Sequence, residues 1–155
     1  MPQYGHFPRT FIEVPWTLTV VTTGVSQTFN IDLAGTTLNI IVNWGDTSSN
    51  TYTTAGTKTH TFASAGTYYV TITGTLTGTS AYVVFYTATG NTSQRITATT
   101  PIAGVTGITN VVNMFRGAMI TSLPAGMFRN CPSLIAILRN LLRLHQVDRN
   151  SGNVV

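Results

Sequence analysis

The chain has 155 residues, of which 43% are hydrophobic and 8% are charged, and its formal net charge is +4. A chain of this length can bury a hydrophobic core without disulfides or metals, and its single cysteine excludes an intrachain disulfide. Eighteen of the fifty residues from Thr51 to Thr100 are threonine, which suits exposed strand faces. Because typical soluble domains carry about 25% charged residues, we expect either a surface covered by other subunits or an extracellular protein with a threonine coat.

The positive charge is concentrated late in the sequence. Residues 1–100 balance three basic against three acidic side chains, whereas residues 101–155 carry five arginines against Asp148 alone. Arginine suits planar, hydrogen-bonded contacts to a protein partner. These arginines lack the clustering and the interleaved aromatic residues of a nucleic-acid-binding face, so nucleic acid is not an expected partner.

The first expected element is an extended arm over residues 1–15, which contain three prolines and the aromatic side chains of Tyr4 and Phe7. From Trp16 onward, apolar and polar residues alternate with period two, which is typical of half-buried strands. Strands are predicted at Trp16–Val20, Phe29–Leu33, Leu38–Trp44, Thr59–Phe62, Tyr68–Ile72, Ala81–Thr87 and Gln94–Ala98. We expect an antiparallel sandwich over residues 16–100, in which the rows Leu38–Trp44 and Tyr68–Ile72 face each other across the core.

Part of this pattern resembles a known family. Three segments resemble, in order, the motifs of the PKD domain, an Ig-like antiparallel β-sandwich: Trp44-Gly45-Asp46, His60-Thr61-Phe62 and Gly66-Thr67-Tyr68-Tyr69-Val70. Thr47 stands where the family usually has a second turn glycine, a position that threonine can occupy in a type I turn. The resemblance implies a structural motif made of Trp44, Gly45, Asp46, His60, Gly66 and Tyr68. PKD-like domains are non-catalytic spacers and binding modules on cell surfaces and virions.

A second resemblance begins after Val105. The sequence Met114-Phe115-Arg116-Gly117 recurs thirteen positions later as Met127-Phe128-Arg129-Asn130. This pattern resembles the start of the leucine-rich repeats in BspA-type bacterial surface proteins, in which a PKD-like domain often precedes the repeats. About three units are needed to stabilise a solenoid, and this chain has fewer. We therefore expect residues 101–155 to form a small repeat-like α/β appendage to the mainly β sandwich.

The last expected element is an amphipathic helix over residues 133–146. Its apolar residues recur at helical spacing: Leu134, Ile137, Leu138, Leu141 and Leu142. We expect Leu138 and Leu142 to cover an apolar face left open by Ile120, Leu123 and Phe128. A membrane-surface helix is the competing interpretation, but such helices are usually richer in lysine and aromatic residues. No apolar run approaches the ~18 residues that a membrane span needs.

Few residues could carry catalysis. The three histidines stand at no metal-ligand spacing to one another or to Cys131. Four carboxylates make an acid–base pair or a calcium site hard to assemble. Asp46 is expected to accept backbone hydrogen bonds in its turn, His60 to be structural, and Cys131 to be a buried, inert thiol. The sequence therefore predicts no catalytic residues, no metal, no cofactor and no enzyme activity.

Two classes of function remain. The first is a virion surface subunit, namely a capsid decoration or cement protein or a tail-associated protein, which contacts other protein subunits. The second is a binding module of a bacterial surface adhesin that recognises glycans or host proteins. The N-terminal residues do not resemble a secretory signal, which favours the virion. The expected partner interface combines aromatic residues of the arm with four arginines: Tyr4, Phe7, Arg116, Arg129, Arg139 and Arg143.

Overall fold

The computed structural model describes residues 14–85, 95–131 and 134. Most of the expected arm, including Tyr4 and Phe7, lies outside the described residues, and so does the expected helix apart from Leu134, including Arg139 and Arg143. In the described part of the chain no helix is long and apolar enough to cross a membrane.

The regular structure of the described residues is β-strand, and every strand expected from the alternation is present. The strands are β1 (Trp16–Thr22), β2 (Gln27–Ala34), β3 (Thr37–Asn43), β4 (Ser49–Tyr52), β5 (Gly56–Phe62), β6 (Gly66–Thr77), β7 (Tyr82–Val84), β8 (Ile96–Thr99) and β9 (Val105–Thr106). Buried and exposed residues alternate regularly along β1 and β3, as expected for strands that bury one face.

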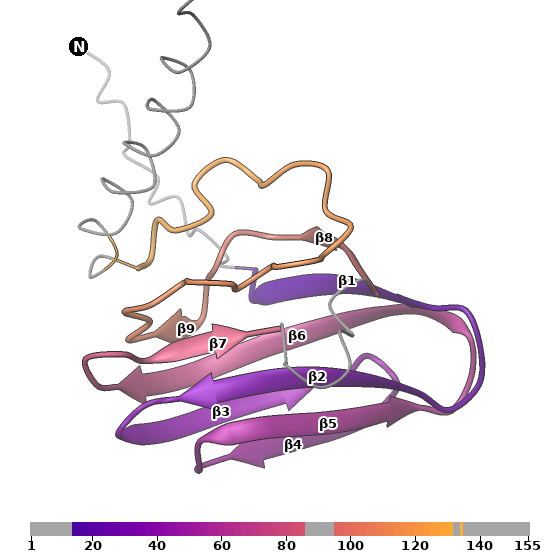
Figure 1. Ribbon diagram of the computed structural model, residues 1–155, viewed down its shortest axis with the longest axis horizontal. Helices are drawn as coiled ribbons and strands as arrows, with labels where there is room; N and C mark the ends of the chain where they lie inside the picture. The colour runs from indigo at the N-terminus through magenta and orange to yellow at the C-terminus, as the bar shows by residue number, and fades with distance from the viewer. Residues whose placement is uncertain (1–13, 86–94, 132–133, 135–155) are drawn as a thin grey trace, which may run out of the picture.

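Two sheets make the sandwich (Figure 1). The larger sheet has the strand order β4-β3-β6-β1-β8, with antiparallel neighbours throughout. Beyond the end of β1, the short strand β9 pairs in parallel with β6 at Gly74 and Thr75. The smaller sheet has the antiparallel order β5-β2-β7. The prediction of a mainly β, antiparallel sandwich is therefore confirmed.

The predicted arrangement of the rows Leu38–Trp44 and Tyr68–Ile72 is wrong. β3 and β6 are adjacent strands of the larger sheet, with Val42 paired to Ile72, so their apolar rows lie side by side on one inner face. The buried hydrophobic residues of the opposite sheet come from β2, β5 and β7: Phe29, Ile31, Leu33, Phe62, Val83 and Val84. Alternation shows which face of a strand is buried, but it does not show which strands pair.

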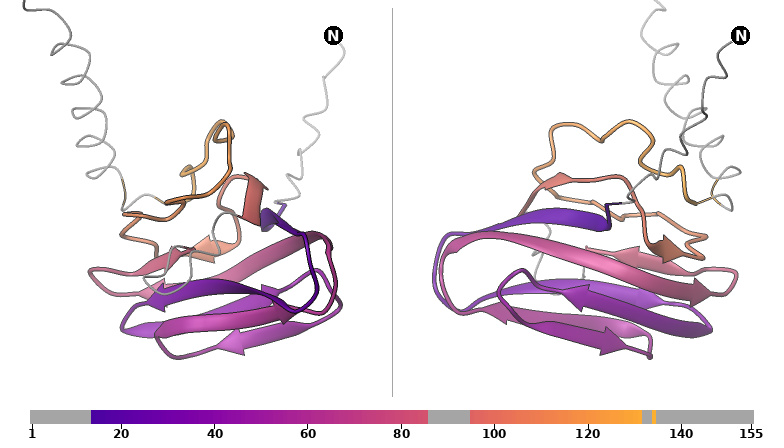
Figure 2. Two further views of the ribbon diagram at one scale, coloured as in Figure 1. Left: turned by 45° about the vertical axis from the view of Figure 1, so that its right-hand side comes forward. Right: turned by 180° about the vertical axis from the view of Figure 1, so that it is seen from behind.

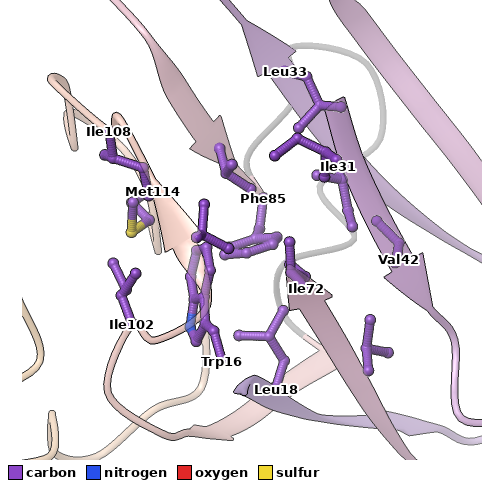
Figure 3. Packing of buried hydrophobic residues seen from close by; sticks show 14 of the residues in the cluster. Trp16, Leu18, Ile31, Leu33, Val42, Ile72, Phe85, Ile102, Ile108 and Met114 are labelled. Carbon is purple, nitrogen blue, oxygen red and sulfur yellow. The ribbon is translucent and has the colours of Figure 1, made fainter. Parts of the chain in front are cut away.

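One hydrophobic cluster fills the sandwich and continues into the segment after β8. Trp16 and Phe85 lie between the strand residues Ile31 and Ile72 on one side and Ile102 and Met114 on the other (Figure 3). The rings of Trp16 and Phe85 meet edge to face, with centroids 5.5 Å apart. Burying a side chain of this size contributes about 1.5 to 3 kcal/mol. The described part of the expected appendage is thus packed on the core of the sandwich.

The thirteen-residue repeat of the sequence is also a repeat of the backbone. We call residues 111–118 the first turn unit and residues 124–131 the second turn unit. In each unit three backbone N–H groups donate to the carbonyl three residues earlier, from Met114, Arg116 and Ala118 and from Met127, Arg129 and Cys131. Asn113 and Gly126, also thirteen apart, both have positive φ angles, of 60° and 70°.

Both turn units are anchored to the sandwich at the same position. Met114 and Met127 are buried, and their carbonyls accept hydrogen bonds from the N–H groups of Phe85 and Ile102, respectively. Figure 2 shows this segment, in orange, along the side of the sandwich formed by β1 and β8, away from β4 and β5. It is built of turns, so the α/β character expected for it is not seen in the described residues.

Candidate functional site

An aromatic row links the two sheets at the motif residues. The indole of Trp44, just after β3, stacks on the imidazole of His60 in β5 with ring centroids 4.4 Å apart. His60 meets Phe62 edge to face at 4.8 Å, and Phe62 stacks on Tyr68 of β6 at 4.1 Å. Because β5 belongs to the smaller sheet and β6 to the larger one, the row ties the sheets together.

Asp46 holds His60 in this row. Its Oδ2 atom lies 2.7 Å from Nε2 of His60, and its Oδ1 atom accepts hydrogen bonds from the backbone N–H of Ser48 at 3.1 Å and from Oγ of Ser48 at 2.5 Å. The side chains of His60 and Asp46 are 15% and 22% exposed. Burial acts to raise the pKa of Asp46, but the hydrogen bonds from Ser48 and His60 outweigh it and hold that pKa below its ordinary value of 3.8.

The order of these three groups does not suit nucleophilic catalysis. A serine nucleophile needs the imidazole as its hydrogen-bond partner, with the carboxylate behind the imidazole. Here the carboxylate of Asp46 lies between Ser48 and His60, so the imidazole does not contact the hydroxyl. The cluster therefore acts as a structural clamp on the turn between β3 and β4.

The pH dependence of stability tests the clamp. We expect Asp46→Asn to lower the free energy of unfolding at neutral pH by about 1 kcal/mol, because a partly exposed ionic hydrogen bond is weaker than a buried one. The folded-state pKa lies below the unfolded value, so this stabilisation is present above about pH 4 and is lost as the pH falls through the folded-state pKa. Urea denaturation should show the difference between wild type and variant shrinking below that pH. A difference that stays constant in acid would contradict a role for the carboxylate charge.

The turn itself has two residues in the left-handed region, Gly45 at φ 79° and Thr47 at φ 74°. A Cβ atom on Gly45 would lie 2.8 Å from the backbone nitrogen of Tyr69, so no larger residue fits. Thr47 stands where the PKD pattern has glycine, and its positive φ is the conformation that glycine favours. The expectation that this threonine occupies an ordinary type I turn position is wrong.

A second cluster joins the turn before β6 to the end of β1. The hydroxyl of Thr22 accepts from the N–H of Gly66 at 3.0 Å and donates to the carbonyl of Ser64 at 3.0 Å. Tyr68 donates to the same carbonyl at 2.8 Å. Thr22 is only 3% exposed, although no motif in the sequence marks it. The sequence feature that could have indicated its burial is its position in the inward-facing row of β1, where it is the next inward residue after Val20.

The described residues form neither a metal-binding site nor a reactive thiol. No group of three His, Cys, Asp or Glu side chains there could hold a metal ion. Cys131 is 3% exposed, and burial raises the pKa of its thiol above the ordinary value of 9.0. A buried, protonated thiol is a poor nucleophile.

The outward-facing side of the larger sheet is without charge. We use the name outer face for the residues of β1, β3, β4 and β6 that alternate with the buried rows: Thr17, Thr19, Val21, Thr37, Asn39, Ile41, Asn43, Ser49, Thr51, Thr67, Tyr69, Thr71, Thr73, Thr75 and Thr77. The residues share this side because their strand partners in the register also belong to the set, as in the pairs Thr17 with Thr71 and Ile41 with Thr73. Threonine and asparagine provide hydrogen-bonding groups there without ionic hydration.

Two of the six expected interface residues are described. Arg116 and Arg129 are exposed and occupy the same position in the two turn units. Tyr4, Phe7, Arg139 and Arg143 lie outside the described residues.

No protein-family model, curated protein or solved structure matches the chain. The resemblances to the PKD domain and to BspA-type repeats therefore stay predictions that rest on the quoted motifs.

Proposed function

We propose that the chain is a non-enzymatic structural and binding protein on the surface of an assembled particle, namely a phage virion subunit of the capsid-decoration, cement or tail-associated kind. Its partners in this proposal are other protein subunits, copies of itself included. The observation that carries the proposal is the uncharged outer face.

An uncharged face suits a surface that is covered in use. The centres of protein interfaces are depleted of charged residues, because a charge that loses its water there must find a partner. The outer face comprises four strands about 4.8 Å apart with an average length of about seven residues, so its area is roughly 450 Å². In a standard interface each partner buries about 800 Å². One such contact is weak, whereas many copies arrayed on a shell add their contacts.

The turn units offer further surface for a partner. Arg116 and Arg129 recur at equivalent positions, and Val112 and Met119 are 61% and 66% exposed. Arginine and methionine are both enriched in protein interfaces relative to the rest of the surface. A subunit that grips a shell would use these residues beside the outer face.

Self-association of the full chain tests the proposal. Because one contact is weak, sedimentation velocity should show reversible association that increases with protein concentration, and the variant Ile41→Lys/Tyr69→Lys should associate at least about tenfold more weakly, since buried unpaired charges oppose docking. Ile41 and Tyr69 are 45% and 62% exposed on the outer face. The matched control is Val25→Lys, which adds a charge at a residue 74% exposed between β1 and β2. The control should associate as the wild type does.

One observation favours a second candidate, a binding module of a bacterial surface adhesin that recognises glycans or host proteins. Tyr69 is an exposed aromatic ring on a face made mostly of threonine, and it lies opposite Thr19 in the register. An exposed ring offers a flat apolar surface for the C–H face of a sugar. A monomer that binds to a glycan array, and that loses this binding in Tyr69→Ala, would replace the virion proposal with the adhesin.

A further inference from the structure

An open hollow of about 290 Å³ lies beside the first turn unit. Its lining is apolar except for two hydroxyl side chains: Phe115, Ala118, Ile120, Thr121, Ser122 and Leu123. Leu123 is 51% exposed and the neighbouring Met119 is 66% exposed. Within the described part of the chain, no charged side chain lines the hollow. Apolar surface can therefore be buried here without removing water from a charge.

The chain that follows Leu134 continues from the end of the second turn unit. Leu134 is fully buried, and its N–H donates to the carbonyl of Cys131 at the end of the second turn unit. It belongs to the hydrophobic cluster against which Phe115 and Ile120 also pack. Residues 135–146 would make a helix about 18 Å long, which is long enough to cross a hollow of this volume.

The sequence of residues 135–146 complements the hollow on one side. Its apolar residues recur at the spacing of one helical face: Ile137, Leu138, Leu141 and Leu142. Arg139 and Arg143 are four residues apart on another face. An arginine placed in an apolar hollow would lose its hydration without an ion pair, so only the leucine face suits the hollow.

We propose that residues 135–146 fold back as a helix, with Leu138 and Leu142 in the hollow between Phe115, Ile120 and Leu123. A tethered segment has an effective concentration of about millimolar, which favours it over a second copy of the chain at micromolar concentration. In this position Arg139 and Arg143 project away from the core. Their use in attachment to other subunits rests on the proposed function, whereas the docking of the segment does not.

Disulfide trapping in the full chain tests the docking. In a Cys131→Ala background, Leu123→Cys is combined in turn with a cysteine at 137, 138, 141 or 142, and in matched controls with a cysteine at 139 or 143. Alanine stands at the equivalent position of the first turn unit, Ala118, so the background should fold. In dilute protein, at least one pair on the apolar face should form an intrachain disulfide about tenfold faster than the controls, because cysteines join only when their Cα atoms come within about 7 Å.

Non-reducing electrophoresis and mass spectrometry separate the outcomes. Disulfides that join two chains would assign the hollow to a second copy and overturn the proposal. Equal oxidation rates on both faces would overturn it too.

Hydrogen exchange supplies a second measurement. Amides of residues 135–146 should exchange about tenfold faster in Leu138→Asp/Leu142→Asp than in the wild type, because the segment would leave the hollow. Arg139→Glu/Arg143→Glu should keep the protection even where it weakens self-association, which separates the docking from the proposed function. Unprotected amides in the wild type would overturn the proposal.

Discussion

Replacing Trp44 by alanine should lower the free energy of unfolding by about 3 to 5 kcal/mol. Trp44 is fully buried, stacks on His60 at 4.4 Å, and donates from Nε1 to Oδ1 of Asn50 at 2.7 Å. Its removal leaves a cavity between the sheets, leaves the side-chain carbonyl of Asn50 without the indole donor, and removes the ring stacked on His60. Urea denaturation followed by far-ultraviolet circular dichroism measures the loss.

Two further variants distinguish the effect of removing the buried ring of Trp44 from the effect of removing any aromatic ring. Trp44→Phe keeps a ring against His60 but loses the hydrogen bond to Asn50, so it should destabilise by about 1 to 2 kcal/mol. Tyr69→Ala removes a ring that is 62% exposed, and its effect should stay within about 0.5 kcal/mol. A loss below about 1 kcal/mol in Trp44→Ala would mean that the aromatic row does not hold the sheets together.

The strands could be predicted because each buries one side of a regular alternation. Trp16, Leu18 and Val20 in β1 are fully buried, and the residues between them are not. The pairing of strands could not be predicted in the same way. β3 and β6 are separated by β4 and β5 in the sequence, yet they are neighbours in the larger sheet. The pairing of β3 with β6 depends on the turns and on the packing of the whole core. The alternation of apolar and polar residues contains no information about either.

The motif residues could be singled out, but their contacts could not. Asp46 and His60 are fourteen residues apart and belong to segments joined to different sheets, and their 2.7 Å contact exists only once the sheets have packed. Thr22 and Gly66 are forty-four residues apart and meet because β1 pairs with β6. Contacts of this range follow from strand pairing and from the packing of the two sheets, so the sequence predicts the residue types and the fold determines their partners.

For the turn units, too, the sequence shows the repeat but not how its residues pack. Their thirteen-residue period is visible in the sequence, but it matches neither the period of a strand nor that of a helix. The burial of Met114 and Met127, at 3% and 4% exposure, was therefore not foreseen. These side chains extend the core of the sandwich beyond β8.

Replacing Gly74 by alanine should destabilise the protein by at least about 3 kcal/mol, in the range of the most disruptive single substitutions. Gly74 lies in β6 between β3 and β9, at φ 126°. A Cβ atom there would lie 2.0 Å from the carbonyl oxygen of Asn39 and 3.0 Å from Cα of Ile40. Both neighbours are backbone atoms of a paired strand, so β3 would have to move away from β6. The N–H of Gly74 also donates to Gly104 at 2.7 Å, so β9 would be displaced as well.

Gly56 provides the matched control. Its φ is 100°, but a Cβ atom there would meet no heavy atom within 4 Å. Gly56→Ala should therefore show the conformational strain alone, about 1 to 2 kcal/mol. Subtracting its loss, measured by urea denaturation, from that of Gly74→Ala isolates the effect of the close approach between β3 and β6. Equal losses in the two variants would mean that the strands can separate at Gly74 with little strain. A larger loss in Gly74→Ala would mean that this glycine is what allows β6 to carry β3 on one edge and β9 on the other, and so to join the turn units to the sandwich.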